Sequence, residues 1–342
     1  GILLNQYFLS LQTFFYLQSQ LNIAKLHIKI KMYQSTTHKP ENSPFVQMLF
    51  LLLFAIGGLI VFAIFGMVLV FFTSGLEVIK GAAMNDYRFI SALKILVVAQ
   101  QIGLFLTPAI LLAVVERKKL SNFYGFQVPK VNWLLLVALL SICWMPLMGL
   151  SNEWNQKMVF PEFLKGLERW MRGMENSAAK TTEAILKMNN VGDLLVNLLV
   201  IAVTPAICEE LIFRGAVQRT IFRIKSNPHV AIWISAIIFS AIHFQFYGFL
   251  PRLLLGAAFG YVYFFTGSIW YAVFAHFLNN AYAVCVAYYL QKNNLSYTNA
   301  DDINMPWYGY LISAILTLAL FVQISKKFKV KKSDDGQLVS ED

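Results

Sequence analysis

Two adjacent carboxylates, Glu209 and Glu210, follow a mostly apolar run, Leu194 to Cys208. An ionised carboxylate inside a bilayer costs about 3 kcal/mol or more, so chains that accept this cost usually need the group for an ion pathway, a proton relay or catalysis. Glu210 and Arg214 are four residues apart, which places them on one helical face where they can pair. Glu209 is turned about 100° from Glu210 on the same helix. It must therefore find a partner on another segment or stay protonated.

Three further polar side chains interrupt the apolar stretches that follow. His243 comes four residues after Phe239, and His276 and Asn280 are four apart, so the latter two share a helical face. A carboxylate and an imidazole can together position and deprotonate a water. A second imidazole and an amide can donate hydrogen bonds to a developing oxyanion. The sequence thus predicts a hydrolytic site in which Glu209 and His243 activate water while His276 and Asn280 bind the oxyanion.

Each of these residues also has a structural interpretation. A single buried histidine in a membrane bundle more often bonds a neighbouring helix than catalyses, and Glu210 with Arg214 most simply forms a supporting ion pair. The residue types also permit a zinc site with an open position, built from Glu209, His243 and His276. The His-Glu-x-x-His helix of common zinc proteases is absent from the sequence. We therefore expect no metal or other cofactor and keep zinc as the alternative.

The elements that must position these groups are membrane helices. Of the 342 residues, 58% are apolar and only 13% are charged, whereas soluble domains average roughly 25% charged residues. A membrane helix needs about 20 apolar residues, and the sequence predicts eight spans: Phe45–Phe72, Ala92–Val115, Trp133–Leu150, Leu194–Phe213, Val230–Phe246, Leu253–Thr266, Ile269–Leu290 and Tyr308–Ile324. The predicted fold is an all-α integral membrane protein whose helices enclose an intramembrane polar cavity.

The predicted domain organisation is one polytopic membrane domain, residues 45–325, between a tail at 1–44 and a tail at 326–342. The stretch before Met32 contains no methionine, and an ordinary polar tail follows it. We therefore expect Met32 to be the natural start and residues 1–31 not to be native, which the intact mass of the native protein would test.

Charge predicts the orientation. The net charge of +10 comes from Lys and Arg clusters between the apolar runs and in the tail at 326–342. With eight crossings these clusters share a side with the N-terminus, so both termini are predicted to be cytoplasmic. The loop with Asp301 and Asp302 then lies outside. We expect a bacterial plasma membrane, with the lipid bilayer and a peptide or membrane-protein substrate as partners and no nucleic acid.

The segment 151–190 is predicted to lie on the outer side, and its charges do not indicate a side as clearly as those of the other loops. It carries mixed charge and an amphipathic pattern that includes Phe163, Leu167 and Trp170. The pattern is typical of an interfacial helix that lies on the bilayer. A lid or a substrate-guiding element is the functional alternative.

Three motifs occur in order: Glu-Glu-x-x-x-Arg from Glu209, Phe-x-x-x-His from Phe239 and His-x-x-x-Asn from His276. Together they resemble the CPBP family, which comprises CAAX prenyl endopeptidases and bacteriocin-processing or immunity proteins, also called Abi proteins. The resemblance covers about residues 194–290. It implies an intramembrane endopeptidase; the eukaryotic members remove the last three residues of prenylated CAAX proteins. Many members bear a metalloprotease name, which keeps the zinc alternative open.

The resemblance also implies roles for this chain's own residues: Glu209 with His243 would activate water, and His276 with Asn280 would form the oxyanion site. Two other functions stay open. A non-proteolytic immunity or peptide-binding protein would keep its phenotype after Glu209→Gln. A transporter that uses these groups as a proton relay would show uptake that depends on the proton gradient, but the first four spans show no inverted repeat.

Overall fold

The computed structural model describes residues 40–75, 78, 86–295, 305–327, 330–332 and 338–340. The chain divides into two units, Gly1–Ser43 and Pro44–Asp342. Only residues 40–43 of the first unit are described, so the proposed start at Met32 lies outside the described residues, as do Asp301 and Asp302.

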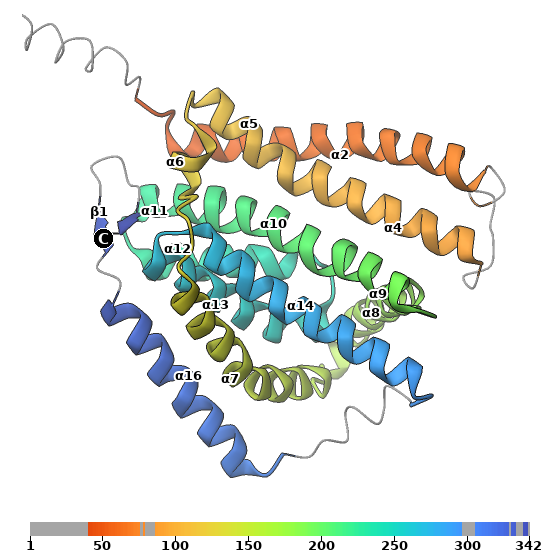
Figure 1. The fold of residues 1–342 in the computed structure, drawn as a ribbon. Coiled ribbons are helices and arrows are strands. Elements are labelled where there is room, and N and C mark those ends of the chain that lie inside the picture. The colour runs from red at the N-terminus through yellow and green to blue at the C-terminus, as the bar shows by residue number, and fades with distance from the viewer. Residues whose placement is uncertain are drawn as a thin grey trace, which may run out of the picture. The chain divides into compact units, whose positions relative to one another are not determined.

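The second unit is helical apart from one short β-pair. Its helices are α2 (Pro44–Ser74), α4 (Tyr87–Gln101), η1 (Ile102–Leu106), α5 (Thr107–Val115), α6 (Leu120–Tyr124), α7 (Val131–Gln156), η2 (Glu162–Leu164), α8 (Lys165–Ile185), α9 (Val191–Asn197), η3 (Leu198–Val203), α10 (Thr204–Glu210), η4 (Leu211–Gln218), α11 (Arg219–Lys225), α12 (Pro228–Ala241), η5 (Phe246–Gly248), α13 (Phe249–Thr266), α14 (Ile269–Lys292) and α16 (Trp307–Lys327) (Figure 1). Strands β1 (Val330–Lys332) and β2 (Leu338–Ser340) pair antiparallel.

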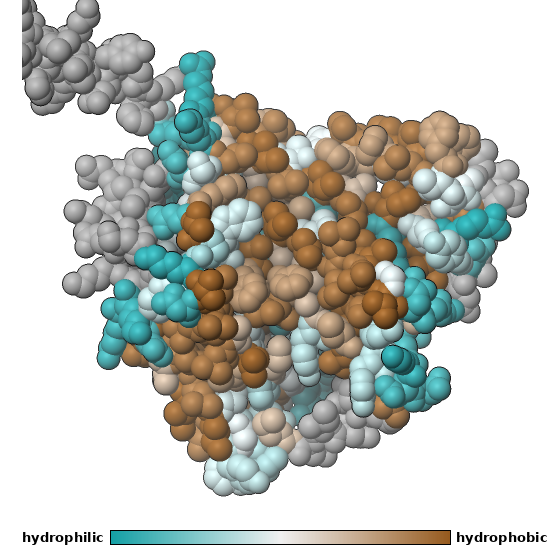
Figure 2. All heavy atoms as spheres, viewed as in Figure 1, coloured by the Kyte–Doolittle hydropathy of each residue, from teal (hydrophilic) through white to brown (hydrophobic). Residues whose placement is uncertain are grey.

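Seven helical stretches among the described residues are long and apolar enough to cross a membrane: Pro44–Ser74, Tyr87–Val115, Val131–Gln156, Val191–Lys225, Phe246–Thr266, Ile269–Lys292 and Trp307–Lys327. Apolar side chains cover most of the face seen in Figure 2, and hydrophilic ones gather toward its margins. The predicted all-α integral membrane fold is confirmed. The fifth of the eight predicted spans corresponds to α12, which is helical but shorter than a span.

The prediction was wrong about where α12 ends. The sequence suggested a span over Val230–Phe246, but the helix stops at Ala241 after 14 residues. At 1.5 Å per residue it is about 21 Å long, short of a core about 30 Å thick. Phe244, two residues past the C-cap Ile242, has a φ of 52°, a left-handed conformation that a bulky residue rarely adopts. His243 therefore lies in a turn and not in a helix.

Two spans are widened at matching positions. The π-helical segments η1 and η3 each run into a Thr-Pro pair, Thr107-Pro108 and Thr204-Pro205. Proline has no backbone N–H and clashes with the carbonyl four residues earlier, so it disturbs the α-helical pattern at that point. In both pairs the threonine hydroxyl donates to the carbonyl five residues back, at 2.9 Å and 2.8 Å. π-Segments inside α-helices occur often at functional sites.

Helices α2 and η1 meet at two glycines. A Cβ on Gly58 would lie 2.2 Å from the carbonyl oxygen of Gly103, and a Cβ on Gly103 would lie 2.6 Å from the carbonyl oxygen of Gly58. Gly57, the preceding residue on α2, has nothing within 4 Å of such an atom. The close approach of α2 and η1 therefore depends on Gly58 and not on Gly57.

We expect Gly58→Ala to lower the free energy of unfolding by about 1–3 kcal/mol, because an overpacked contact forces the backbones apart. The matched control Gly57→Ala should be neutral or slightly stabilising, since alanine favours a helix more than glycine does. Unfolding in mixed detergent micelles compares the two. Equal effects of both changes would contradict the close packing.

Helix α8 follows the span Val131–Gln156 in the chain and precedes the span Val191–Lys225, and charged groups pair along its first turns. Glu168 accepts hydrogen bonds from Lys165 Nζ at 2.9 Å and from Arg172 Nε at 3.2 Å. The Lys165 bond, more than any other contact, holds the pKa of the Glu168 carboxyl below its usual value. Two turns further along α8, Glu175 Oε2 accepts from the backbone N–H of Tyr247, at 3.2 Å. Helix α8 thus contacts the turn that carries His243.

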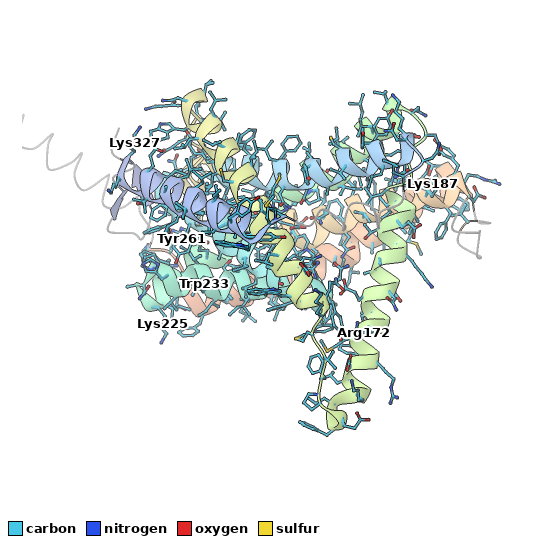
Figure 3. The ribbon with its side chains drawn as sticks, turned by 90° about the horizontal axis from the view of Figure 1, so that it is seen from below. Arg172, Lys187, Lys225, Trp233, Tyr261 and Lys327 are labelled. Atoms are coloured by element: carbon cyan, nitrogen blue, oxygen red, sulfur yellow. The ribbon has the colours of Figure 1, made fainter. Side chains whose placement is uncertain are left out.

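Lys225 at the end of α11 and Lys327 at the end of α16 lie toward the same end of the second unit (Figures 1 and 3). Lys187, beyond the end of α8, lies toward the other end in Figure 3. Two of the cation clusters used for the orientation, the one after Arg214 and the one at the end of α16, therefore lie toward one side, although which side faces the cytoplasm stays a prediction.

Candidate functional site

The site is built around Glu210, whose side chain is fully buried. Arg214 Nη1 lies 3.0 Å from Glu210 Oε1, one helical turn away, as the spacing predicted. Arg214 is 1% exposed and its Nη2 donates to the carbonyl oxygen of Gly256 at 2.9 Å. Its guanidinium also lies over the rings of Phe239 and Phe259, 4.6 Å and 5.4 Å from their centroids. The arginine thus joins the carboxylate helix to α12 and α13.

Close backbone approach makes this arrangement possible. A Cβ on Gly256 would lie 3.0 Å from the Phe239 ring, and one on Gly260 would lie 2.9 Å from Ile232. The spacing of these two glycines is that of helices packed closely in membranes. It brings α12 against α13 and leaves the Gly256 carbonyl within reach of Arg214.

His276 connects the two carboxylates. Its Nδ1 lies 2.8 Å from Glu210 Oε1, and its Nε2 lies 3.9 Å from Glu209 Oε2. A carboxylate only accepts hydrogen bonds, so Nδ1 carries the proton of this bond. The 3.9 Å gap is too long for a direct hydrogen bond and suits one bridging water. The ring is held by stacking on Phe259, with centroids 4.9 Å apart.

Glu209 has a partner that sequence reasoning missed. Gln101, at the end of α4, donates from Nε2 to Glu209 Oε1 at 2.9 Å, across 108 residues of sequence. The signal that could have revealed it was weak: two adjacent amides, Gln100 and Gln101, in the long apolar span Tyr87–Val115. This bond satisfies one carboxylate oxygen and leaves the other, Oε2, facing His276.

His243 lies just past the end of α12. Its Nδ1 is 2.8 Å from the carbonyl oxygen of Phe239, and a carbonyl can only accept, so Nδ1 is the protonated nitrogen. In the neutral ring Nε2 then carries a lone pair, which suits a base or the acceptor for a water. The turn is braced by Asn155, whose amide donates to the Phe246 carbonyl and accepts from Leu250 N–H.

Asn280 makes a contact that the spacing did not predict. Its Nδ2 donates to the carbonyl oxygen of Ile201 at 3.1 Å. Ile201 is four residues before Pro205, which has no N–H to offer that carbonyl. One of the two amide hydrogens of Asn280 thus serves the widened helix, and the second is available for another acceptor.

All four predicted groups line one cavity of about 580 Å³: Glu209, His243, His276 and Asn280. Other polar side chains that line it are Gln100, Gln101, Ser177, Thr181, Thr182, Gln245, Arg252 and Asn279. Glu210 and Arg214 are buried and are not among the residues that line the cavity. Helix α8 supplies one side with Met174, Ala178 and its hydroxyl residues, so the segment 151–190 contributes to the cavity.

The zinc alternative has a poor fit. Within the part of the chain that the structure describes, no three side chains of His, Cys, Asp or Glu are grouped closely enough to hold a metal ion. Glu209 and His276 approach each other, but His243 does not complete a cluster with them. We therefore derive no step through a metal.

We expect Gln101→Leu to lower kcat about 10-fold with little change in KM, since a hydrogen bond to a charged group contributes about 1.5–3 kcal/mol. The amide holds the Glu209 carboxylate in place, so a loss confined to kcat is the expected signature. Gln100→Leu, which changes the neighbouring amide on the cavity wall, is the matched control. A larger loss with the control would contradict the assignment.

Comparison with known proteins finds a matching family and two similar curated proteins. Residues 191–282 match the family described as Type II CAAX prenyl endopeptidase Rce1-like. The chain is 30% identical over 106 residues to "Putative membrane peptidase YdiL" of Bacillus subtilis (strain 168), which covers 31% of this chain and 42% of that relative. It is 29% identical over 84 residues to "Uncharacterized protein YpbD" of the same strain, which covers 23% and 40%. No solved structure matches the chain.

The matched parts span less than half the length of these curated relatives, but the family match contains all three motifs. It begins with α9, includes both carboxylates and His243, and ends two residues past Asn280. Residues 191–282 of this integral membrane protein match the Rce1-like family, and the resemblance inferred from the motifs is confirmed.

Proposed function

We propose that this chain is an intramembrane endopeptidase of the CAAX-protease type, which hydrolyses a peptide bond with a water activated by Glu209 and His243. The observation that supports it most is the shared cavity of Glu209, His243, His276 and Asn280. A family of peptidases over residues 191–282 supports the same reaction class. The site lies in a bacterial plasma membrane with the termini in the cytoplasm.

In the proposed mechanism Glu209 Oε2 accepts a proton from the water, whose second contact is the lone pair of His243 Nε2. The resulting hydroxide attacks the scissile carbonyl, and the oxygen of that carbonyl becomes the oxyanion. Glu209 then returns its proton to the leaving amine. Gln101 holds Oε1 of Glu209 throughout, so one carboxylate oxygen is fixed while the other reacts.

The oxyanion is bound by His276 and Asn280. Donation from His276 Nε2 requires the imidazolium form, because Nδ1 already carries the proton that faces Glu210. Two carboxylates, Glu209 and Glu210, face one arginine, Arg214, so a protonated His276 makes this four-group cluster neutral. Such fixed donors act strongly in a site that excludes water.

A non-proteolytic peptide-binding or immunity protein is the second candidate. The Asn280–Ile201 bond favours it to a degree, since one amide hydrogen of the proposed oxyanion donor already serves the fold. This alternative predicts peptide retention without cleavage.

The test is proteolysis by the purified protein in lipid nanodiscs with a diverse hydrophobic peptide pool, followed by mass spectrometry. Products made by wild type and lost in His243→Ala support the proposal, since His243 has no part in the Glu210–Arg214 pair. Products made equally by both proteins would indicate a contaminating protease. Retained but uncut peptides would favour the binding protein.

We expect chelation to leave the reaction unchanged. Treatment with 1,10-phenanthroline, then removal of the chelator, should change kcat/KM less than about 2-fold, because Glu209, His243 and His276 form no three-ligand group. Zinc content measured by mass spectrometry on the same sample is the control. Loss of activity that added zinc restores would replace the metal-free mechanism with the zinc alternative.

A further inference from the structure

One charge in the cavity has no role in the proposed hydrolysis. Arg252 lies in the first turn of α13 and lines the cavity with Glu209 and both imidazoles. Among the described lining residues it is the one Lys or Arg, and Glu209 is the one Asp or Glu. A cation therefore lines the same cavity as the proposed base.

The guanidinium is held in one orientation. Its Nη1 donates to Gln245 Oε1 at 2.9 Å, and its Nη2 donates to the Gln245 carbonyl. A Cβ on Gly248 would lie 2.8 Å from Nη2 and 3.0 Å from Cζ. The guanidinium thus lies directly against the glycine backbone, in space that any side chain at 248 would fill.

These contacts leave donors unused. A guanidinium has five N–H groups, and the two bonds to Gln245 use two of them. Its Nε is buried without a hydrogen-bond partner among the described residues. Bracing the turn at Gln245 explains the position of Arg252, but not why a cation with spare donors faces a cavity for substrate.

We propose that Arg252 binds a carboxylate of the substrate inside this cavity, next to the scissile bond. A guanidinium matches a carboxylate in shape, with two parallel hydrogen bonds, and attraction between the two charges is strong where water is excluded. The carboxylate is the free C-terminus of the peptide or an Asp or Glu side chain close to the cut. The proposal rests on the proposed proteolysis and names the substrate class for it.

The test compares matched peptides on wild-type protein in nanodiscs. One cleavable sequence is made in three forms: with a free C-terminus, with a C-terminal amide, and with its acidic residue replaced by the corresponding amide. We expect removal of the essential carboxylate to lower kcat/KM about 10–100-fold, the effect of hydrogen bonds to a charged group. The form that loses activity identifies the source of the carboxylate.

Arg252→Gln should abolish this preference, so that the ratio of kcat/KM for the carboxylate peptide to kcat/KM for the amide peptide falls to about one. Arg252→Lys should keep part of it, since charge remains but the two-pronged geometry is lost. Arg172→Gln is the matched control, because Arg172 lies over Tyr247 in the same turn region yet outside the cavity lining. It should keep the full preference.

The inference is overturned if wild type cuts all three peptides equally, or if Arg252→Gln slows the carboxylate and amide peptides by the same factor. Retention of each peptide by the protein is measured in the same samples. Absent cleavage with carboxylate-selective retention that Arg252→Gln removes would sink the proteolysis and keep the carboxylate site. Absent selectivity in both readouts would reject the carboxylate site.

Discussion

Glu209→Gln should lower kcat/KM by about 10²–10⁴-fold, the range that general acid–base catalysis contributes. Glutamine has the same shape, and its amide oxygen can accept the hydrogen bond from Gln101 that the Glu209 Oε1 atom accepts now. What it cannot do is take a proton from water. The loss should therefore fall on kcat, with KM changed much less.

The fold should survive this substitution, because an amide in the same place removes a buried charge without opening a cavity. We expect an unfolding midpoint equal to or above that of wild type. Glu183→Gln is the matched control, a glutamate on the exposed side of α8, and should keep wild-type rates. Full activity in Glu209→Gln would remove Glu209 from the mechanism and favour a binding protein.

The spacing of residues along the sequence correctly predicted contacts within a single helix. Glu210 and Arg214 had to meet because four residues make one turn, and the structure has them 3.0 Å apart. The lengths of the apolar runs predicted the membrane helices, because about 20 apolar residues are needed to cross a bilayer. The two glutamates, the two histidines and Asn280 within those lengths stood out because lipid tolerates such groups poorly.

Contacts between distant segments were harder to predict. Gln101 meets Glu209 because α4 packs against α10, and two adjacent amides in an apolar span do not say which of them faces which helix. The Asn280–Ile201 bond does have a signal in the sequence, because Pro205 has no N–H to donate to the carbonyl of Ile201, four residues before it. A search for an amide to satisfy that carbonyl would have suggested Asn280.

The end of α12 was mispredicted for a physical reason. Ile242, Phe244 and Phe246 continue the apolar pattern after Ala241, and no glycine or proline occurs between Ala241 and Tyr247 to mark the stop. Tertiary contacts force Phe244 into the left-handed region: Asn155 and Glu175 both bond the backbone of the following residues. These contacts come from α7 and α8, so the turn that carries His243 is set by helices outside the motifs.

Arg214→Met should lower the free energy of unfolding by about 3–5 kcal/mol, the cost of leaving a buried charge without its partner. The pair is 1% and 0% exposed at its two side chains. Arg214→Lys should also destabilise the protein, because a lysine cannot reproduce both the bond to the Gly256 carbonyl and the stacking on Phe239. Unfolding in mixed micelles measures both.

A double variant separates pairing from packing. Glu210→Gln with Arg214→Met removes both charges, so it should cost clearly less than Arg214→Met alone. The matched control is Glu168 with Arg172, which has the same four-residue spacing at 3.1 Å but a half-exposed arginine. Because solvent screens that pair, Arg172→Met should cost less than about 1 kcal/mol. If the costs of Glu210→Gln and Arg214→Met simply add in the double variant, attraction between the two charges does not stabilise the fold. The pair then contributes to the free energy of unfolding through packing alone.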